Sequence, residues 1–484
     1  MIDKVRLNPF AYEMGFRGDV FITLLNGIGV IAGVLVLYGL IARFMGVEAL
    51  GEFLLVRRIT FPLMGILLVG MTTGLPYYVS RLGDNAYGSA ALLLFGLLTL
   101  PLISLASVAL HYGVLSGFPH TLALPFFIFA VGYALQFLVY GLFRGHLNIL
   151  GANLLQLIGT GLIPVGLFFL LYRRGIPSLL MAFGLGTLIL SGLAGIIKLR
   201  DGWSGVDGRK IAQLLVYGVQ RVPSSLAFFI LLGGVPLLIL SSTSKAEIAF
   251  VNSGISLIRL FMVVVGPLGV VLLPRLSKAL AADQKARIID GLEALVKTTF
   301  LVGVTLAIFL SINSEALMRV WLGSESTAGA DIVALIVLAL PFYLLMAVLR
   351  APIDAASVRG YNSLIYGAAA LALLTIFYGL KLAGVDSTVA GAISFIGGHM
   401  TGSVASLYYT YKFYGINITS PWYLMTVLGM VTFSIILVCS INALVSGLLS
   451  LLLGGITLLL ALGLLFMKSR SAWIVDFRSL VTTR

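Results

Sequence analysis

Four arginines lie inside long apolar stretches of this 484-residue chain, where a charged side chain is unusual. Arg57 and Arg58 are adjacent, whereas Arg221 and Arg259 each lie about ten residues inside a stretch, or about 15 Å along a helix. A guanidinium stays charged in apolar surroundings, and its planar fork donates two parallel hydrogen bonds to a phosphate. The chemistry that these residues offer is therefore the binding of an anion.

Arg221 and Arg259 have no obvious carboxylate to pair with. None of the 18 Asp and Glu residues lies in the middle of an apolar stretch, and Glu247 stands at the far end of the stretch that holds Arg259. An arginine at the centre of a bilayer costs at least about 2.5–3.5 kcal/mol on insertion scales, so it turns toward a partner or water. The two arginines predict a hydrated cavity whose ligand brings the negative charge. The alternative for Arg221 is a bond to a carbonyl group of a broken helix.

Arg57 and Arg58 extend this site. Because consecutive helical residues point about 100° apart, at most one of the two faces the cavity squarely, and the other meets a neighbour or lipid headgroups. Three amides complete the predicted substrate-binding set: Asn26, Gln220 and Asn252. They could contact hydroxyl groups of a ligand, as could Gln136 and Gln156, and the alternative for each is hydrogen bonding between helices.

The elements that must hold these residues are membrane helices. Apolar residues make up 60% of the chain and charged residues 10%. A bilayer core about 30 Å thick needs about 20 helical residues, and only helices or closed barrels satisfy the backbone there. Fourteen apolar runs without strict alternation reach about that length, at 19–44, 53–80, 89–112, 122–143, 151–172, 177–197, 211–241, 248–273, 292–312, 331–348, 363–382, 389–411, 422–441 and 444–467. We expect an all-α polytopic membrane protein with about fourteen transmembrane helices.

Basic residues predict the orientation. The 31 Lys and Arg residues concentrate on one side of the predicted spans, so both termini are expected to be cytoplasmic. The net charge of +13 then indicates membrane lipids as partners rather than nucleic acid. The first apolar run lacks a cleavage site and is expected to be a retained helix, and the single cysteine, Cys439, offers no disulfide.

Signals of catalysis and of cofactor binding are missing from the sequence. His111, His120, His146 and His399 show no metal-ligand spacing, and there is no P-loop and no G-x-S-x-G motif. The chain is predicted to be no enzyme and to hold no metal or cofactor. A membrane glycan polymerase or ligase is the enzymatic alternative, but it needs a catalytic loop outside the bilayer, and the outer connections are short.

Four short segments carry a family resemblance. They are GVEALGEF at 46–53, LFRG at 142–145, IRL at 258–260 and GPLGVVLLPRLSK at 266–278. Together with fourteen spans, they resemble polysaccharide flippases of the MOP (multidrug/oligosaccharidyl-lipid/polysaccharide) exporter superfamily, in its Wzx-like branch. The resemblance implies two six-helix lobes around a central cavity, followed by two further helices at the carboxyl terminus.

The order of the predicted spans gives the expected domains, and the resemblance implies a cargo. The expected domains are 1–200 for the amino-terminal lobe, 201–210 for a cytoplasmic linker, 211–412 for the carboxyl-terminal lobe, and 413–484 for the last two helices and a tail. The implied cargo is an undecaprenyl-pyrophosphate-linked oligosaccharide, moved across the cytoplasmic membrane by alternating access for surface polysaccharides such as O-antigen. The expected partners are this substrate, membrane lipids and glycan-assembly enzymes, and the chain is expected to be a monomer.

Two other branches of the superfamily remain alternatives. Lipid II flippases similarly have arginines in the second and eighth spans, which correspond here to Arg57 or Arg58 and to Arg259. An acidic residue often precedes the eighth-span arginine in that branch, and this chain has Ile258 there. Cation-coupled drug exporters tend to use a carboxylate inside the membrane, whereas the first span here offers Asn26, which favours an anionic lipid-linked cargo.

Overall fold

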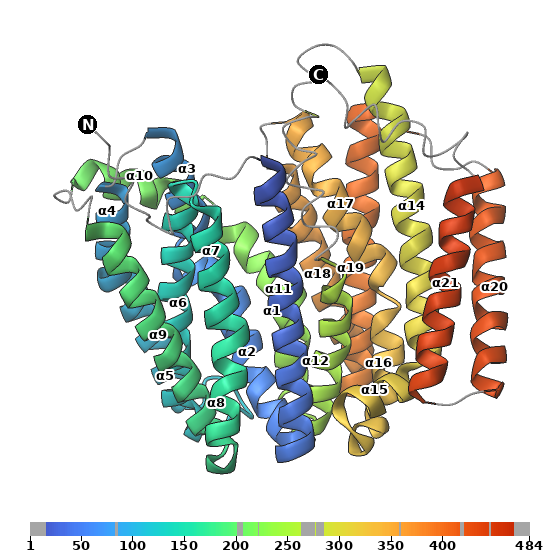
Figure 1. The fold of residues 1–484 in the computed structure, drawn as a ribbon, viewed down its shortest axis with the longest axis horizontal. Helices are drawn as coiled ribbons and strands as arrows, with labels where there is room; N and C mark the ends of the chain where they lie inside the picture. The colour runs from blue at the N-terminus through green and yellow to red at the C-terminus, as the bar shows by residue number, and fades with distance from the viewer. Residues whose placement is uncertain are drawn as a thin grey trace, which may run out of the picture. The chain divides into compact units, whose positions relative to one another are not determined.

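The computed structural model describes residues 16–82, 86–200, 207–220, 222–262, 276, 285–357, 360–416, 421–444 and 447–468. In these ranges the chain forms helices joined by short turns, and no strand occurs there (Figure 1). The all-α class predicted from the sequence is confirmed. Several predicted features lie outside the described residues: Arg221, residues 201–206 of the linker, residues 263–273 of the eighth apolar run, and the tail from 469 onward.

The chain divides into two compact units, Met1–Phe229 and Ile230–Arg484. The first contains α1 (Phe16–Met45), α2 (Val47–Leu67), α3 (Met71–Leu82), α4 (Ala86–Leu94), α5 (Leu100–His111), α6 (Ala123–Gly145), α7 (Ile149–Gln156), α8 (Ile163–Leu171), α9 (Ile176–Arg200) and α10 (Gly208–Val219). The boundary falls within α11 (Val222–Ile239). The second contains α12 (Lys245–Leu260), α14 (Lys285–Ile312), α15 (Ser314–Leu322), α16 (Ala330–Val337), α17 (Leu340–Ala356), α18 (Tyr361–Leu382), α19 (Ser387–Tyr414), α20 (Pro421–Leu444) and α21 (Leu448–Lys468). The predicted lobes joined by a linker at 201–210 stay a prediction.

Helix length and composition make the chain a multi-pass membrane protein. Within the described residues, eight helical segments are long and apolar enough to cross a bilayer, and a pair bent by 46°, Ser324–Val337 with Leu340–Ala356, would make a ninth. Each of the predicted apolar runs coincides with at least part of a helix. Of the three arginine-bearing runs, 53–80 and 248–273 lie outside these nine, because α2 carries two acidic and two basic residues and α12 has only 16 residues.

Glycines let the helices of the first unit approach closely. The backbones of α6 and α9 meet where Gly132 faces Gly184, since a Cβ on Gly132 would lie 3.1 Å from the Cα of Gly184. In the same way α1 meets the π-helical turn η3 (Leu157–Leu162), because a Cβ on Gly33 would lie 2.9 Å from the Cα of Gly161. Helices in lipid associate largely through such close packing, because apolar side chains gain little by leaving lipid tails.

A break between α2 and α3 interrupts the second predicted run. Val69 (φ 46°) and Gly70 (φ 68°) take left-handed backbone conformations there, which end the helix. Gly218 of α10 packs against this break, and a Cβ at Gly218 would clash with the carbonyl oxygen of Val69. The hydroxyl of Thr99 donates a hydrogen bond of 3.0 Å to the carbonyl oxygen of Leu67, which satisfies an acceptor that the break leaves open.

In the second unit, α19 packs against α12, α14, α16, α17 and α18. The closest approach to α18 uses Gly398, where a Cβ would lie 3.0 Å from the carbonyl oxygen of Ala369. One turn later, a Cβ at Gly402 would lie 3.1 Å from the Cβ of Ala369 and would meet Met346 of α17. Small residues on α19 therefore allow it to contact several helices at once.

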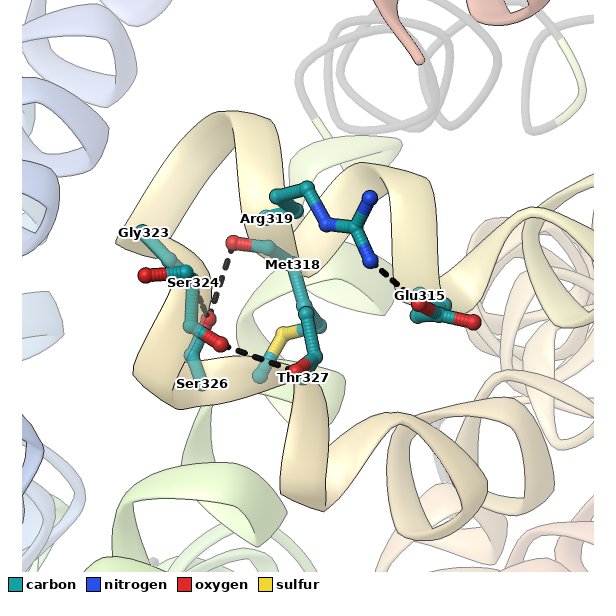
Figure 2. Close-up of polar contacts among 7 residues, drawn as sticks. All are labelled: Glu315, Met318, Arg319, Gly323, Ser324, Ser326 and Thr327. Carbon is teal, nitrogen blue, oxygen red and sulfur yellow. Dashed lines mark hydrogen bonds and ion pairs between the residues drawn. The ribbon is translucent and has the colours of Figure 1, made fainter. Parts of the chain in front are cut away.

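The turn after α15 is closed by a buried serine (Figure 2). The hydroxyl of Ser326 is within hydrogen-bond distance of the carbonyl oxygens of Met318, at 2.9 Å, and Gly323, at 2.6 Å. Ser326 is fully buried, so these contacts replace the water that its hydroxyl loses. On the exposed side of α15, Arg319 forms an ion pair of 2.6 Å with Glu315, one helical turn earlier.

Candidate functional site

Arg57 is held by aromatic ring faces. It is half-buried in α2, and its guanidinium carbon lies 4.6 Å from the ring centroid of Phe61 and 5.6 Å from that of Tyr38 in α1. Phe61 follows Arg57 by four residues, and this spacing places two side chains on the same face of a helix. Both distances fall within the range of cation–π attraction, in which the negative face of a ring attracts a cation.

A cluster of rings from α6 fixes Phe61 in turn. The ring centroid of Phe61 lies 4.8 Å from that of Tyr133, 5.9 Å from that of Phe137 and 6.2 Å from that of Phe129. Tyr133 and Phe129 are fully buried, whereas Phe61 and Phe137 are half-buried. We call Tyr38, Phe61, Phe129, Tyr133 and Phe137 the aromatic cluster.

The charge of Arg57 is not neutralised by a described acidic residue. The ion pairs in the described part of the chain include Lys297–Glu293 in α14, Arg319–Glu315 in α15 and Arg350–Asp354 in α17, and neither Arg57 nor Arg259 takes part in one. None of the described residues accepts a hydrogen bond from Arg57. Its N–H donors are therefore available to a ligand.

Arg58 occupies a different environment from its neighbour. Its residue exposure is 3%, and it interacts with protein groups around it. This difference follows from the angle of about 100° between consecutive helical residues, which turns the two side chains toward different surroundings. Of the two arginines, Arg57 is the one whose accessibility suits ligand contact.

Arg259 lies in the last turn of α12 and is half-buried. A cation in this position interacts favourably with the carbonyl end of the helix dipole. Glu247 cannot reach it, because it lies twelve residues earlier, about 18 Å along the helix. Glu247 instead closes a capping box with Ser244, whose backbone N–H donates to the Glu247 carboxylate at 2.9 Å and whose hydroxyl accepts from the Glu247 N–H at 3.2 Å.

Asn26 belongs to a network of buried amides in the first unit. Its Nδ2 donates to Gln156 Oε1 at 3.1 Å and to Asn153 Oδ1 at 3.4 Å, both in α7. Asn153 Nδ2 donates in turn to the hydroxyl of Thr23 at 3.1 Å. The Oδ1 atom of Asn26 is buried without a hydrogen-bond partner. Asn153 and Thr23 were not predicted from the sequence as site residues. Asn153 stands three residues before Gln156, and Thr23 stands three residues before Asn26.

The π-helical turn η3 next to this network is stabilised by side chains of α6 and α9. Gln136 Nε2 donates to the carbonyl oxygen of Leu155 at 2.8 Å, and Thr160 donates to Gln136 Oε1 at 3.3 Å. Thr187 of α9 donates to the carbonyl oxygen of Gly159 at 3.3 Å. Side chains of the neighbouring helices therefore bind the backbone both within η3, at Gly159, and just before it, at Leu155 in α7.

The remaining predicted residues are placed as follows. Asn252 is fully buried in α12, where its Nδ2 donates to the carbonyl oxygen of Ile248 at 2.8 Å. Gln220 is exposed at the end of α10. Arg221 lies outside the described residues. Ligand contact by these residues stays a prediction, as it does for Asn26 and the other arginines.

The described residues do not form a metal site. In the searched ranges no group of three or more His, Cys, Asp or Glu side chains is placed to hold a metal ion. His399 is fully buried, donates a hydrogen bond of 2.9 Å from Nδ1 to the carbonyl oxygen of Phe395, and packs against the Phe395 ring. The candidate site consists of Arg57 and the two rings that contact its guanidinium, Phe61 and Tyr38.

Comparison with known proteins relates the fold to transporters. No family model and no curated protein sequence matches the chain. Among solved structures, the chain matches the lipid II flippase MurJ in an inward closed conformation with a TM-score of 0.68 and 16% identity, over 94% of this chain and 99% of MurJ. It also matches an inward-facing multidrug resistance MATE family transporter of the MOP superfamily, with a TM-score of 0.52 and 15% identity, over 87% of this chain and 97% of that one.

This chain has the fold of the MOP superfamily. A variant of the MATE transporter VcmN from Vibrio cholerae gives a third match, with a TM-score of 0.55 and 15% identity, over 82% of this chain and 95% of that one. The superfamily resemblance read from the sequence is thus confirmed at the level of the MOP fold, and its Wzx-like branch stays a prediction. These three solved neighbours are a flippase and two transporters, and that the present chain is no enzyme stays a prediction.

Proposed function

We propose that this protein is a flippase that moves a lipid-linked oligosaccharide with a phosphate or pyrophosphate linkage across the cytoplasmic membrane by alternating access. The observation that carries the proposal is Arg57, a half-buried cation that rings hold in place and that no described carboxylate neutralises. A guanidinium in such a place needs an anion, and a phosphate accepts two of its N–H donors at once. Both termini lie in the cytoplasm in this proposal.

Arg259 supports the same substrate class from the second unit. It has no ion-pair partner among the described residues, and its half-buried side chain stands at the end of α12. The helix dipole stabilises this cation by about 0.3–1 kcal/mol without occupying its N–H donors. In the proposal, Arg58 supports α2 from within the protein, and Arg259 and Arg221 are further cations suited to the same class of substrate.

Lipid II is the second candidate cargo. The fold match to the lipid II flippase MurJ covers 94% of this chain, whereas the two MATE matches cover 87% and 82%. A pyrophosphate linkage is the chemistry that both cargoes offer to an arginine, so the site as described accepts either. A cationic drug fits less well, because the polar groups around Asn26 are amides and hydroxyls rather than carboxylates.

The experiment is a flipping assay with the purified full chain in liposomes. The probe is an undecaprenyl-pyrophosphate-linked disaccharide with a fluorescent sugar, and a membrane-impermeant quencher reports which leaflet the label occupies. We expect Arg57→Gln to slow flipping by roughly ten- to hundredfold, the loss that corresponds to a hydrogen bond with a charged group. Arg319→Gln removes an exposed arginine that already has an acidic partner and should leave the rate unchanged.

If the Arg57→Gln variant flips the probe at the wild-type rate, the proposal that Arg57 binds the phosphate, which we call the arginine mechanism, is wrong. If the wild-type chain does not flip the probe in liposomes but raises the tolerance of cells to organic cations, the result would favour a drug exporter. Replacing the disaccharide probe by fluorescent lipid II distinguishes the two glycan cargoes.

A further inference from the structure

The geometry points to Phe61 and Tyr38 as positioning residues for Arg57, which hold its guanidinium by ring faces so that its N–H edge stays open to the phosphate. The inference rests on the proposed function of Arg57 and adds how the protein prepares that residue. The guanidinium carbon of Arg57 lies 4.6 Å from the ring centroid of Phe61 and 5.6 Å from that of Tyr38.

A binding arginine has to be held, because its long side chain otherwise loses conformational freedom each time a ligand binds. A carboxylate is the usual partner, but it occupies N–H donors and cancels the charge that the ligand needs. An aromatic ring attracts the cation through the electron density of its face. The N–H bonds of a guanidinium lie in the plane of the group, so a ring over that plane leaves them free.

The rings themselves are locked in place. Phe61 is surrounded by three aromatic side chains of α6, and the closest is Tyr133 with centroids 4.8 Å apart. Tyr38 is 3% exposed and meets Phe53 edge to face, with centroids 6.1 Å apart. The guanidinium therefore contacts rings from α1 and α2, and both α1 and α6 pack against α2 within the first unit.

Phe61 contacts the guanidinium of Arg57 and Phe129 does not, so the two rings can be compared in one experiment. It is half-buried and lies under the guanidinium, whereas Phe129 is fully buried and touches Phe61. Neither a hydrogen bond nor a ring contact joins Phe129 to Arg57. Substitution at Phe129 is thus a matched control for effects on packing of the cluster.

The test is a fluorination series. Stepwise replacement of Phe61 by mono-, di- and trifluorophenylalanine weakens the negative face of the ring while nearly preserving its size. The purified full chain is titrated with farnesyl pyrophosphate, a short soluble prenyl pyrophosphate, and binding is measured calorimetrically. We expect affinity to fall with each added fluorine, by about tenfold at the third, and to stay within twofold of wild type for the same series at Phe129.

Two substitutions separate the possible outcomes. Phe61→Trp, which offers a stronger ring face, should bind at least as tightly as wild type, and Phe61→Leu should bind at least tenfold more weakly. If Arg57→Gln weakens binding but the fluorination series at Phe61 is flat or matches that at Phe129, the positioning role is wrong and the proposed function stands. If Arg57→Gln binds as wild type does, the arginine mechanism and this inference fail together.

Discussion

The amide of Asn26 in α1 donates a hydrogen bond of 3.1 Å to the amide oxygen of Gln156 in α7. The two residues stand 130 positions apart in the chain, so the bond ties the first helix to the segment that leads into η3. Asn153 joins the same donor at 3.4 Å. A network of neutral amides thus links two helices of the first unit without any buried charge of its own.

This relationship predicts energetic coupling between Asn26 and Gln156. We expect Asn26→Leu to lower the free energy of unfolding by about 1–3 kcal/mol, because the buried Asn153 and the half-buried Gln156 of α7 lose their donor. Once Asn26 is gone, Gln156→Leu should have a smaller effect than in the wild type, with a coupling energy of about 0.5–1.5 kcal/mol. Unfolding of the four proteins in detergent micelles measures the cycle, and simple additivity of the two substitutions would contradict the prediction.

The contact between α6 and α9 predicts a position-dependent effect of adding one methyl group. A Cβ at Gly184 would lie 2.5 Å from the carbonyl oxygen of Ile128 and 2.7 Å from the Cα of Phe129, so backbone must move to admit it. We expect Gly184→Ala to destabilise the protein by about 1–3 kcal/mol, as overpacking does. Thermal unfolding in detergent measures the change.

Gly192 provides a matched control on the same helix. A Cβ there would meet nothing within 4 Å, so Gly192→Ala should be neutral or should stabilise α9 by up to about 1 kcal/mol through its better helix propensity. Equal destabilisation by the two alanine substitutions would show that the close contact at Gly184 is not the cause.

His146, immediately after α6, predicts a pH dependence of stability. Burial lowers the pKa of this imidazole from its ordinary value of 6.5, and the positive charge of Lys198 lowers it further. The folded protein therefore binds fewer protons than the unfolded chain once the pH falls below about 6.5, and protonation then opposes folding. We expect stability to fall as the pH is lowered from about 7 to 5.

The variant His146→Asn isolates this effect. It cannot take up the proton, so its unfolding temperature should decline less than that of the wild type over the same pH range. Above about pH 7 the contribution of His146 is constant, because the imidazole is neutral in both states. Parallel curves for the two proteins across the whole range would contradict the assignment of the pH dependence to His146.

Much of the architecture follows from the sequence by local rules. A run of about 20 apolar residues becomes a helix in lipid whatever its neighbours are, because the backbone must satisfy its own hydrogen bonds there. This is why each predicted run overlaps a helix in the part of the chain that the structure describes. Even the pairing of Arg57 with Phe61 has a local basis, since residues four apart share one face of a helix.

Tertiary structure decided what no local rule could. The choice of Arg57 over Arg58 as the accessible arginine depends on which face of α2 the neighbouring helices cover. The break at Val69 uses a left-handed conformation that a β-branched residue rarely adopts, and it persists where Gly218 packs against it.

The partners of the polar and charged groups likewise came from other helices. Tyr38 reaches Arg57 from α1, and Asn153 reaches Asn26 from α7, although neither pair shows a signal in the sequence. A helix in lipid forms from its own residues, so composition alone predicts it. Which side chains meet depends on the rotation and depth at which helices pack, and those are set by the fit of many surfaces at once.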